Sequence, residues 1–350
     1  MNTPRASILL PVFDAERWLG VCLRSLQRQR MGDWECVLVD DGSSDGSLAI
    51  AREFAAGDPR IRVFAEPHAG LIAALQFGLA HCRAPIVVRM DADDWMHRDR
   101  LALQCAAFDD DRSLCAVGTR VRLFPRSRAG DTRERPLPGE EARVRTGRFG
   151  YEAWLNAIES PRDVVRNAWI ECPIAHPTLA IRREALERFG YRDVPWPEDY
   201  DLVLRLIAAG ERLGVVPKRL VAWREAGDRL SRRSTRYDTD AFAACKAAHL
   251  AQTFLRERGD YGLWGYGGTG RLLASKLQEH GLAPRHIVDV HPRRVGQRIR
   301  GAPVIAPEAL AHHERTPLVV SVAGTGARQE IRGFLEGLDY REGRDFVCAA

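Results

Sequence analysis

The feature that most constrains the fold is an alternation of apolar strands with amphipathic helical segments near the start of the chain. Four short apolar runs have strand-like sequence: residues 6–13, 35–42, 61–67 and 85–89. The segments between them carry apolar residues at the spacing of one helical face. Repeated strand–helix units are typical of a parallel sheet covered by helices, so the sequence predicts an α/β fold.

The length of the chain, 350 residues, exceeds that of a typical single domain, so two domains are expected. A helical segment at 238–259 is predicted to connect them, because a new strand–helix pattern begins directly after it. Residues 125–148 lack periodicity and are rich in charge, proline and glycine. That composition predicts a surface loop or a mobile flap.

The composition is that of a globular protein, with 45% hydrophobic and 28% charged residues. The net charge of +5 comes almost wholly from arginine. Two interpretations stay open: a bias in composition, or affinity for phosphates or an anionic membrane surface. Acidic residues are interspersed along the whole chain, and no nucleic-acid partner is expected.

The eight cysteines are scattered and form no C-x-x-C pair. This pattern argues against a zinc site and a disulfide framework, and it favours a reducing compartment. The first residues do not read as a signal peptide, and no segment approaches the roughly 20 apolar residues of a membrane helix. We therefore expect a cytoplasmic protein, or one peripheral at the inner face of the membrane.

Two acidic clusters follow predicted strands. Asp40 and Asp41 come after the second strand, and Asp91, Asp93 and Asp94 come after the fourth. In open α/β sheets ligands bind beyond the carboxyl ends of the strands. Oxygen-rich sites suit Mg²⁺ or Mn²⁺, which take one or two carboxylates together with substrate phosphates. Single aspartates could simply cap helices, but two clusters at one sheet edge favour a metal and phosphate site.

Several segments, in this order, carry a resemblance to a known family. They are "ILLPVFDAERWLGVCLRSLQRQ", "ECVLVDDGSSDGS", "EPHAGLIAALQFGLAHC", "VVRMDADDWMHRDRL", "CPIAHPTLAIRREALERFGYRD" and "PEDYDLVLRLIAAG". Together they resemble glycosyltransferase family 2, the inverting nucleotide-sugar transferases of the GT-A fold. The resemblance covers roughly residues 6–235. It implies a GT-A domain at 1–235, with a doubly wound mixed and mostly parallel sheet, then a helical linker at 236–258.

The resemblance also implies how the donor is bound. Pro11 and Asp41 lie where the family holds the nucleobase, and Asp91 lies where it meets the ribose side of the donor. Asp93 belongs to the family's D-x-D motif and would ligate the Mn²⁺ or Mg²⁺ that bridges the donor diphosphate. Arg89, at the end of the preceding strand, is included among the donor-binding candidates.

On the acceptor side, the motif "EDYD" lies where the family places its catalytic base. Asp199 would be that base, and Glu198 would orient the acceptor or the base. A positioned carboxylate suits the reaction, because the acceptor hydroxyl must lose a proton and inversion needs no covalent intermediate. His176 matches a family position near the acceptor site and is included with the donor-binding candidates. A structural role for this histidine is the alternative.

One departure from the family pattern follows the base helix. Many members have Arg-x-His there, whereas this chain has Ala226 in place of the histidine. Arg229, Arg232 or Arg233 could bind the diphosphate instead, since a guanidinium group matches phosphate geometry. The alternative for this arginine-rich run is a solvated linker.

The last part of the chain, 259–350, contains G-x-G-x-x-G as Gly265, Gly267 and Gly270, between a predicted strand and a predicted helix. Asp289 ends the next strand, as the dinucleotide fingerprint requires. We expect a Rossmann-like module that binds a nucleotide or dinucleotide, regulates, or docks. No tyrosine in the chain has lysine four residues later, which counts against a dehydrogenase or epimerase of the Tyr/Lys type.

The sequence therefore predicts a metal-dependent inverting glycosyltransferase. Its donor would be a nucleoside-diphosphate sugar, with UDP as the expected nucleotide. Its acceptor would be a glycan or a lipid-linked saccharide in surface polysaccharide assembly. Two alternatives are an NAD(P)-dependent sugar-nucleotide oxidoreductase or epimerase that uses the C-terminal module, and a non-catalytic nucleotide-sugar sensor.

Overall fold

The computed structural model describes residues 3–125, 150–225 and 234–350. The predicted loop at 125–148, apart from its first residue, and the arginines Arg229, Arg232 and Arg233 lie outside the described residues. The chain divides into two compact units. Unit 1 comprises residues 1–164, 173–193 and 209–229, and unit 2 comprises residues 165–172, 194–208 and 230–350.

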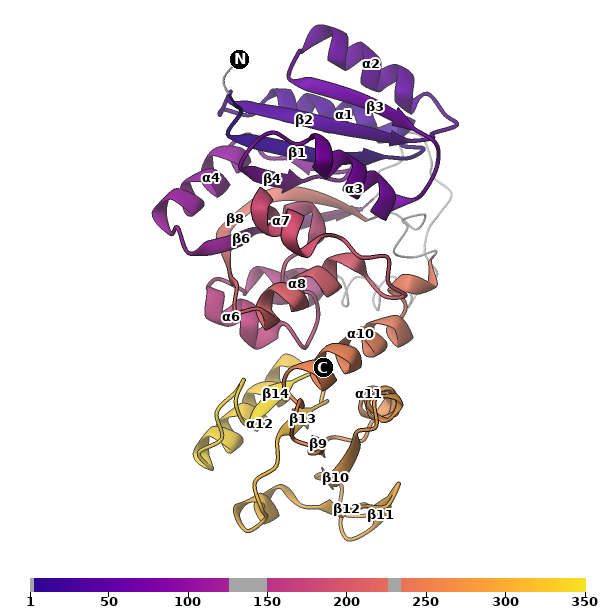
Figure 1. The fold of residues 1–350 in the computed structure, drawn as a ribbon. Coiled ribbons are helices and arrows are strands. Elements are labelled where there is room, and N and C mark those ends of the chain that lie inside the picture. Colours follow the sequence, from indigo (N-terminus) through magenta and orange to yellow (C-terminus); the bar gives the residue numbers. More distant parts are fainter. Residues whose placement is uncertain (1–2, 126–149, 226–233) are drawn as a thin grey trace. The chain divides into compact units, whose positions relative to one another are not determined.

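Unit 1 is built on a sheet of eight strands (Figure 1). Its first four strands are parallel and lie in the order β3 (Ile61–Glu66), β2 (Trp34–Asp41), β1 (Ala6–Val12) and β4 (Ile86–Arg89). The sheet continues with β7 (Ala180–Arg182), β6 (Leu114–Pro125), β8 (Arg212–Glu225) and β5 (Trp95–Met96). Both β7 and β5 run antiparallel to their neighbours, so the sheet is mixed and mostly parallel, as predicted.

Helices cover this sheet on both faces, which explains the continuous apolar runs of its central strands. The helices of unit 1 include α1 (Glu16–Gln27), α2 (Ser47–Gly57), α3 (Leu71–His81), α4 (Arg100–Asp110) and α7 (Arg183–Phe189). Ile8 of β1 belongs to a core that includes Leu19 and Leu23 of α1. The opposite face of β1 meets α3, where a side chain at Gly78 would collide with Leu9.

Unit 2 contains a second sheet, of six strands, in the order β11-β12-β10-β9-β13-β14. Five are parallel: β9 (Asp260–Trp264), β10 (Ala283–Val288), β12 (Ala302–Ile305), β13 (Leu318–Val320) and β14 (Phe346–Cys348). In chain order the parallel strands are arranged 3-2-1-4-5, which is the order of a doubly wound Rossmann-type sheet. The short β11 (Arg298–Ile299) adds an antiparallel edge.

The helices of unit 2 include α8 (Glu198–Ala208), α10 (Thr239–Gln252), α11 (Gly268–Glu279) and α12 (Thr325–Gly337). A short 3-10 helix, η2 (Thr235–Tyr237), precedes α10, and α6 (Pro161–Asn167) spans the boundary of the two units in sequence. No helix among the described residues is long and apolar enough to cross a lipid bilayer.

Candidate functional site

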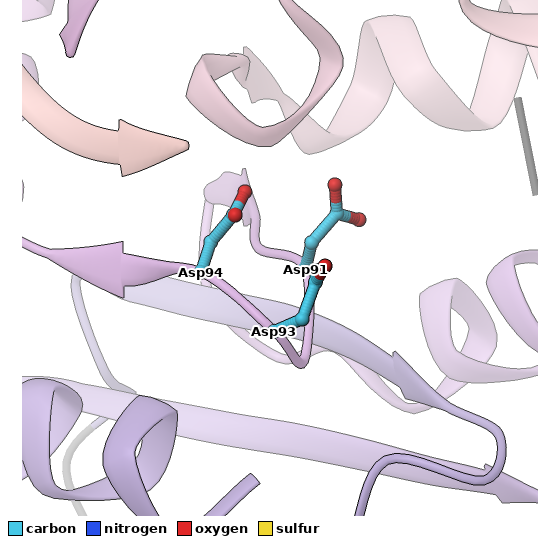
Figure 2. Close-up of side chains that lie close together, drawn as sticks. All are labelled: Asp91, Asp93 and Asp94. Carbon is cyan, nitrogen blue, oxygen red and sulfur yellow. The ribbon is translucent and has the colours of Figure 1, made fainter. Parts of the chain in front are cut away.

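Three carboxylates lie together in the loop that joins β4 to β5 (Figure 2). One carboxylate oxygen each from Asp91, Asp93 and Asp94 lies within 4.8 Å of the other two. Asp94 is buried, whereas Asp91 and Asp93 are half-buried. The structure thus brings together all three aspartates that the sequence placed after the fourth strand.

Two buried arginines lie behind these carboxylates. Arg89 ends β4, and its Nη2 lies 2.6 Å from Asp91 Oδ1 in an ion pair. Arg100 begins α4, is fully buried, and donates from Nη2 to the backbone oxygen of Arg89 at 2.9 Å. Burial lowers the pKa of Arg100 to about 9, and the charges of Asp94 and Asp91 act in the opposite direction. Arg100 is therefore still a cation at neutral pH and offsets part of the repulsion among the aspartates.

The loop is also held by Arg224 of β8, which the sequence analysis did not select. The Arg224 amide donates to Asp94 Oδ1 at 2.7 Å, and its Nε donates to the Asp93 carbonyl at 2.8 Å. Its guanidinium carbon lies 3.8 Å from the ring centre of Trp18 and 4.6 Å from that of Phe124. A sequence signal did exist, because Arg224 is the arginine of the family's Arg-x-His pattern.

Asp41 ends β2 and is almost fully buried. Its carboxylate accepts from the amides of Ala69 at 2.8 Å and Gly70 at 3.0 Å, and it lies 2.9 Å from His68 Nδ1. The His68 ring stacks on Phe13, with ring centres 4.2 Å apart. Asp41 therefore orders the loop before α3, and the exposed aromatic pair was not predicted. Pro11 lies within neighbouring β1, where it pairs with Val39 of β2.

His176 is buried, and its Nε2 lies 2.9 Å from the hydroxyl of Tyr191. Burial, together with the nearby charge of Arg89, lowers the pKa of His176 to about 3. The imidazole is consequently neutral at physiological pH. The contact with Tyr191 holds the imidazole in place, and a role of His176 beside the donor or acceptor stays a prediction.

The residues of the acidic loop fit a hard divalent cation in their chemistry. All three ligand atoms are carboxylate oxygens, which Mg²⁺ and Mn²⁺ prefer over nitrogen or sulfur. The three oxygens all lie within 4.8 Å of one another, and two ligands of one Mg²⁺ ion lie at most about 4.2 Å apart, because each is about 2.1 Å from the metal.

In unit 2, the predicted base and its neighbour occupy the first turn of α8. Glu198 is 2% exposed, and its Oε2 accepts a hydrogen bond of 2.7 Å from the Tyr237 hydroxyl. Asp199 is more exposed, and its Oδ1 accepts from the Tyr200 amide at 2.8 Å. Carboxylates are stabilised at a helix N-terminus, where unpaired backbone N–H groups and the helix dipole favour negative charge.

A buried carboxylate that the sequence analysis missed anchors this helix. Asp201 is fully buried and lies 3.0 Å from His249 Nε2 and 2.7 Å from Arg205 Nε. It also accepts from the indole N–H of Trp196 at 3.1 Å. These partners fix the rotation of α8 and thereby the direction of its first turn.

The glycine loop of the C-terminal module contains a residue with positive φ and a close approach of two backbone segments. Gly265 has a φ of +91°, and a side chain at Gly270 would collide with the Gly265 carbonyl oxygen. Apart from its two chain neighbours, no residue that the structure describes has an atom within 4 Å of where a Cβ on Gly267 would be. Asp289 follows β10, but its carboxylate is held by Arg294 Nη1 at 2.9 Å. A ribose hydroxyl at this position would have to compete with that ion pair.

The mixed and mostly parallel sheet of unit 1, with helices on both faces, has the GT-A fold. The family model described as Glycosyl transferase family 2 matches residues 7–190. A protein named glycosyltransferase EpsE, from Bacillus subtilis (strain 168), is 30% identical over 261 residues, which cover 71% of this chain and 85% of EpsE. The chain therefore belongs to glycosyltransferase family 2, as the resemblance implied.

Two further comparisons agree with this family and fold. The chondroitin synthase of Escherichia coli is 31% identical over 125 residues, which are 36% of this chain and 18% of that synthase. A crystal structure of S. aureus TarS aligns with a TM-score of 0.51 and 17% identity, over 79% of this chain and 71% of TarS. The likeness to TarS supports the fold.

Proposed function

We propose that this glycosyltransferase is a metal-dependent, inverting enzyme. It transfers a sugar from a nucleoside diphosphate, with UDP as the expected nucleotide, to a hydroxyl of a glycan or lipid-linked acceptor. The reaction belongs to surface polysaccharide assembly, in the cytoplasm or at the inner face of the membrane. The observation that carries the proposal is the cluster of Asp91, Asp93 and Asp94 at the edge of a GT-A sheet.

The names of related proteins support the donor and the pathway. Chondroitin synthase makes a polysaccharide, and one structure of TarS is described as a complex with UDP-GlcNAc. TarS shares only 16% identity in that comparison, so the choice of UDP rests on the family resemblance. The family resemblance and the TarS complex both support a nucleotide-sugar donor.

On the donor side, Asp93 is proposed as a metal ligand and Asp91 as the contact to the ribose side. A divalent cation, when bound, supplies positive charge to the leaving diphosphate. Arg89 fixes the direction of the Asp91 carboxylate through the 2.6 Å ion pair. Asp41 and Pro11 are proposed to border the nucleobase. Arg229 and Arg232, outside the described residues, are proposed to bind the diphosphate.

On the acceptor side, Asp199 is proposed as the base that takes the proton of the attacking hydroxyl. Glu198 is proposed to orient the acceptor or Asp199, and Tyr237 restrains Glu198 through the 2.7 Å hydrogen bond. A positioned carboxylate base contributes roughly 10²–10⁴-fold to the rate. The reaction is a single displacement, because inversion of the anomeric carbon requires one attack and no covalent enzyme intermediate.

We also propose a division into a catalytic domain at 1–235, a linker at 236–258 and a module at 259–350. The 3-2-1-4-5 order of parallel strands supports a Rossmann-like module. Gly265, Gly267 and Gly270 are proposed to approach a nucleotide or dinucleotide in that module, with Asp289 beside it.

The test is calorimetric titration with UDP, GDP, dTDP and NAD(H), with and without Mn²⁺. We expect one nucleoside diphosphate to bind in a Mn²⁺-dependent manner, and Asp93→Asn to weaken that binding at least tenfold. Asp33→Asn, which changes an exposed aspartate of the same unit, is the matched control. Nucleotide binding that is indifferent to Mn²⁺ and to Asp93→Asn would refute the metal-dependent site. Tight binding of NAD(H), with no binding of a nucleoside diphosphate, would refute the proposal that the donor is a nucleoside-diphosphate sugar.

A further inference from the structure

Unit 2 contains a pocket of about 290 Å³ between α10 and α11 that the proposed transferase reaction does not use. Residues of both helices line it, together with one residue of η2, one that follows α6 and one that follows β14. The lining residues are Glu171, Tyr237, Thr239, Phe242, Ala243, Lys246, Thr269, Leu272, Leu273 and Ala349.

Glu171 is a half-buried carboxylate in the wall of this pocket. Its side chain makes no hydrogen bond or ion pair with any residue that the structure describes. Desolvation by burial raises the pKa of Glu171, and the positive charge of Lys246 acts in the opposite direction. A desolvated carboxylate without a hydrogen-bond partner destabilises the fold unless a ligand supplies that partner. The position of Glu171 therefore points to a ligand.

Lys246 is the second charged group of the pocket. Its Nζ donates to the carbonyl oxygens of Ile170 at 2.6 Å and Ala349 at 3.1 Å. An ammonium group has three N–H donors, so one is left to point into the pocket. Burial lowers the pKa of Lys246 to about 8, and no ion pair joins it to Glu171.

The charges select the class of ligand. One carboxylate and one ammonium group leave the pocket without net charge. A phosphate would be repelled by Glu171, and a cation would be repelled by Lys246. A hydroxyl group suits both, because its O–H donates to the carboxylate while its oxygen accepts from the ammonium. The hydroxyls of Thr239 and Thr269 add polar contacts, and Phe242 offers an apolar face to ring C–H groups.

The size of the pocket narrows the class further. Small-molecule sites have volumes of about 300–1,000 Å³, and this pocket lies at the lower limit of that range. A dinucleotide is too large for it, whereas a single pyranose ring fits. We propose that the pocket between α10 and α11 binds one ring of a neutral saccharide. The ring is either a free monosaccharide or the end unit of a saccharide chain.

This pocket does not include the residues proposed for catalysis, but one residue of its wall contacts one of them directly. Tyr237 lines the pocket, and its hydroxyl holds Glu198 of the "EDYD" motif. A sugar bound beside Tyr237 is thus placed to alter the orientation of Glu198. The binding proposal itself does not depend on the transferase reaction.

The experiment is saturation-transfer NMR on the full chain. The probes are methyl glycosides of glucose, galactose and N-acetylglucosamine, a β-linked disaccharide of each, inorganic phosphate and glycine betaine. We expect saturation transfer to at least one sugar, and a loss of affinity of at least tenfold in Glu171→Ala. Glu279→Ala, at the opposite end of α11, is the matched control. Asp93→Asn should bind the sugar as the wild type does, which separates this pocket from the donor site.

The outcomes decide the proposal in each direction. Stronger binding of a disaccharide than of its monosaccharide identifies the end of a chain as the ligand, and equal binding identifies the free sugar. Absence of sugar binding overturns the proposal, and so does preferential binding of glycine betaine or phosphate. If Glu171→Ala does not fold, Thr269→Val takes its place. Unchanged sugar affinity in a folded Glu171→Ala or Thr269→Val protein also overturns it.

Discussion

The Tyr237 hydroxyl donates a 2.7 Å hydrogen bond to Oε2 of Glu198, a carboxylate that is only 2% exposed. The two residues are 39 positions apart in the chain, and both belong to unit 2. Burial, together with the charge of Glu198, raises the pKa of Tyr237, so the phenol stays protonated and remains a donor. Tyr237 therefore fixes the rotamer of a residue in the acidic first turn of α8.

Tyr237→Phe should lower kcat about tenfold and leave the KM for the donor unchanged. The reason is that the substitution removes a hydrogen bond to a charged group, worth about 1.5 kcal/mol, without removing the ring from its packing. Steady-state kinetics over a range of donor concentrations measures the two parameters. Tyr266→Phe, also in unit 2, is the control. A rise in donor KM with constant kcat would contradict the positioning role.

Arg224→Lys should weaken Mn²⁺-supported nucleotide binding about tenfold. Lysine cannot donate to the Asp93 carbonyl and at the same time stack on Trp18 with a planar group, so the acidic loop loses a restraint. Calorimetric titration of the nucleotide in the presence of Mn²⁺ measures the change. The control is Arg219→Lys, on the same strand, whose side chain is 61% exposed. Equal affinities in the two variants would show that Arg224 does not organise the site.

The ring of His176 should not titrate between pH 5 and pH 8, since its pKa in the folded state is lowered to about 3. In the unfolded chain the same histidine takes up a proton near pH 6.5. Folding stability linked to this residue is thus fully present above pH 6.5 and is lost as the pH falls toward 3. NMR shifts of the imidazole protons, followed from pH 5 to pH 8, test whether the His176 ring titrates, with exposed His312 as an internal comparison. A His176 titration near neutral pH would disprove it.

Glu171→Gln should raise the free energy of unfolding by about 1 kcal/mol at pH 7, because the wild-type carboxylate is desolvated without a partner. Its pKa is raised in the folded state, so wild-type stability linked to Glu171 is present below pH 4.5 and declines as the pH rises. The advantage of the variant should therefore vanish in acid. Urea titrations at several pH values measure it, with Glu279→Gln as control. A destabilised variant at pH 7 would indicate a protein partner for Glu171.

Strands β1, β2 and β4 could be predicted because both of their faces are buried, which gives uninterrupted apolar runs. The longer strands β6 and β8 were not predicted. Their sequences alternate apolar residues with arginine, and their pairing contains register shifts near Thr119 and Arg120. These shifts break the two-residue period on which recognition of a half-buried strand depends.

The acidic loop could be predicted because its residues follow one strand in sequence. Its supports could not be predicted in the same way, since Arg224 contacts Asp94 across 130 positions. Asp201 was passed over beside Asp199 for a related reason. Periodicity shows that a residue of α8 faces inward, and Trp196 and Arg205 lie near Asp201 in sequence. Its contact with His249 of α10, however, spans 48 positions and forms only in the folded chain.

The arginines that hold the acidic loop have a consequence for the order of binding. Asp91, Asp93 and Asp94 carry three formal negative charges. Arg89, Arg100 and Arg224, which also holds this loop, return three positive ones, so the formal charges cancel. A loop without net charge attracts a bare divalent ion only weakly against the ion's hydration shell, and it does not repel a diphosphate. Each ligand supplies the charge that the other lacks, so cation and nucleotide should raise each other's affinity by the same factor. In the proposed reaction, the loop would therefore capture the two as a preformed ion pair.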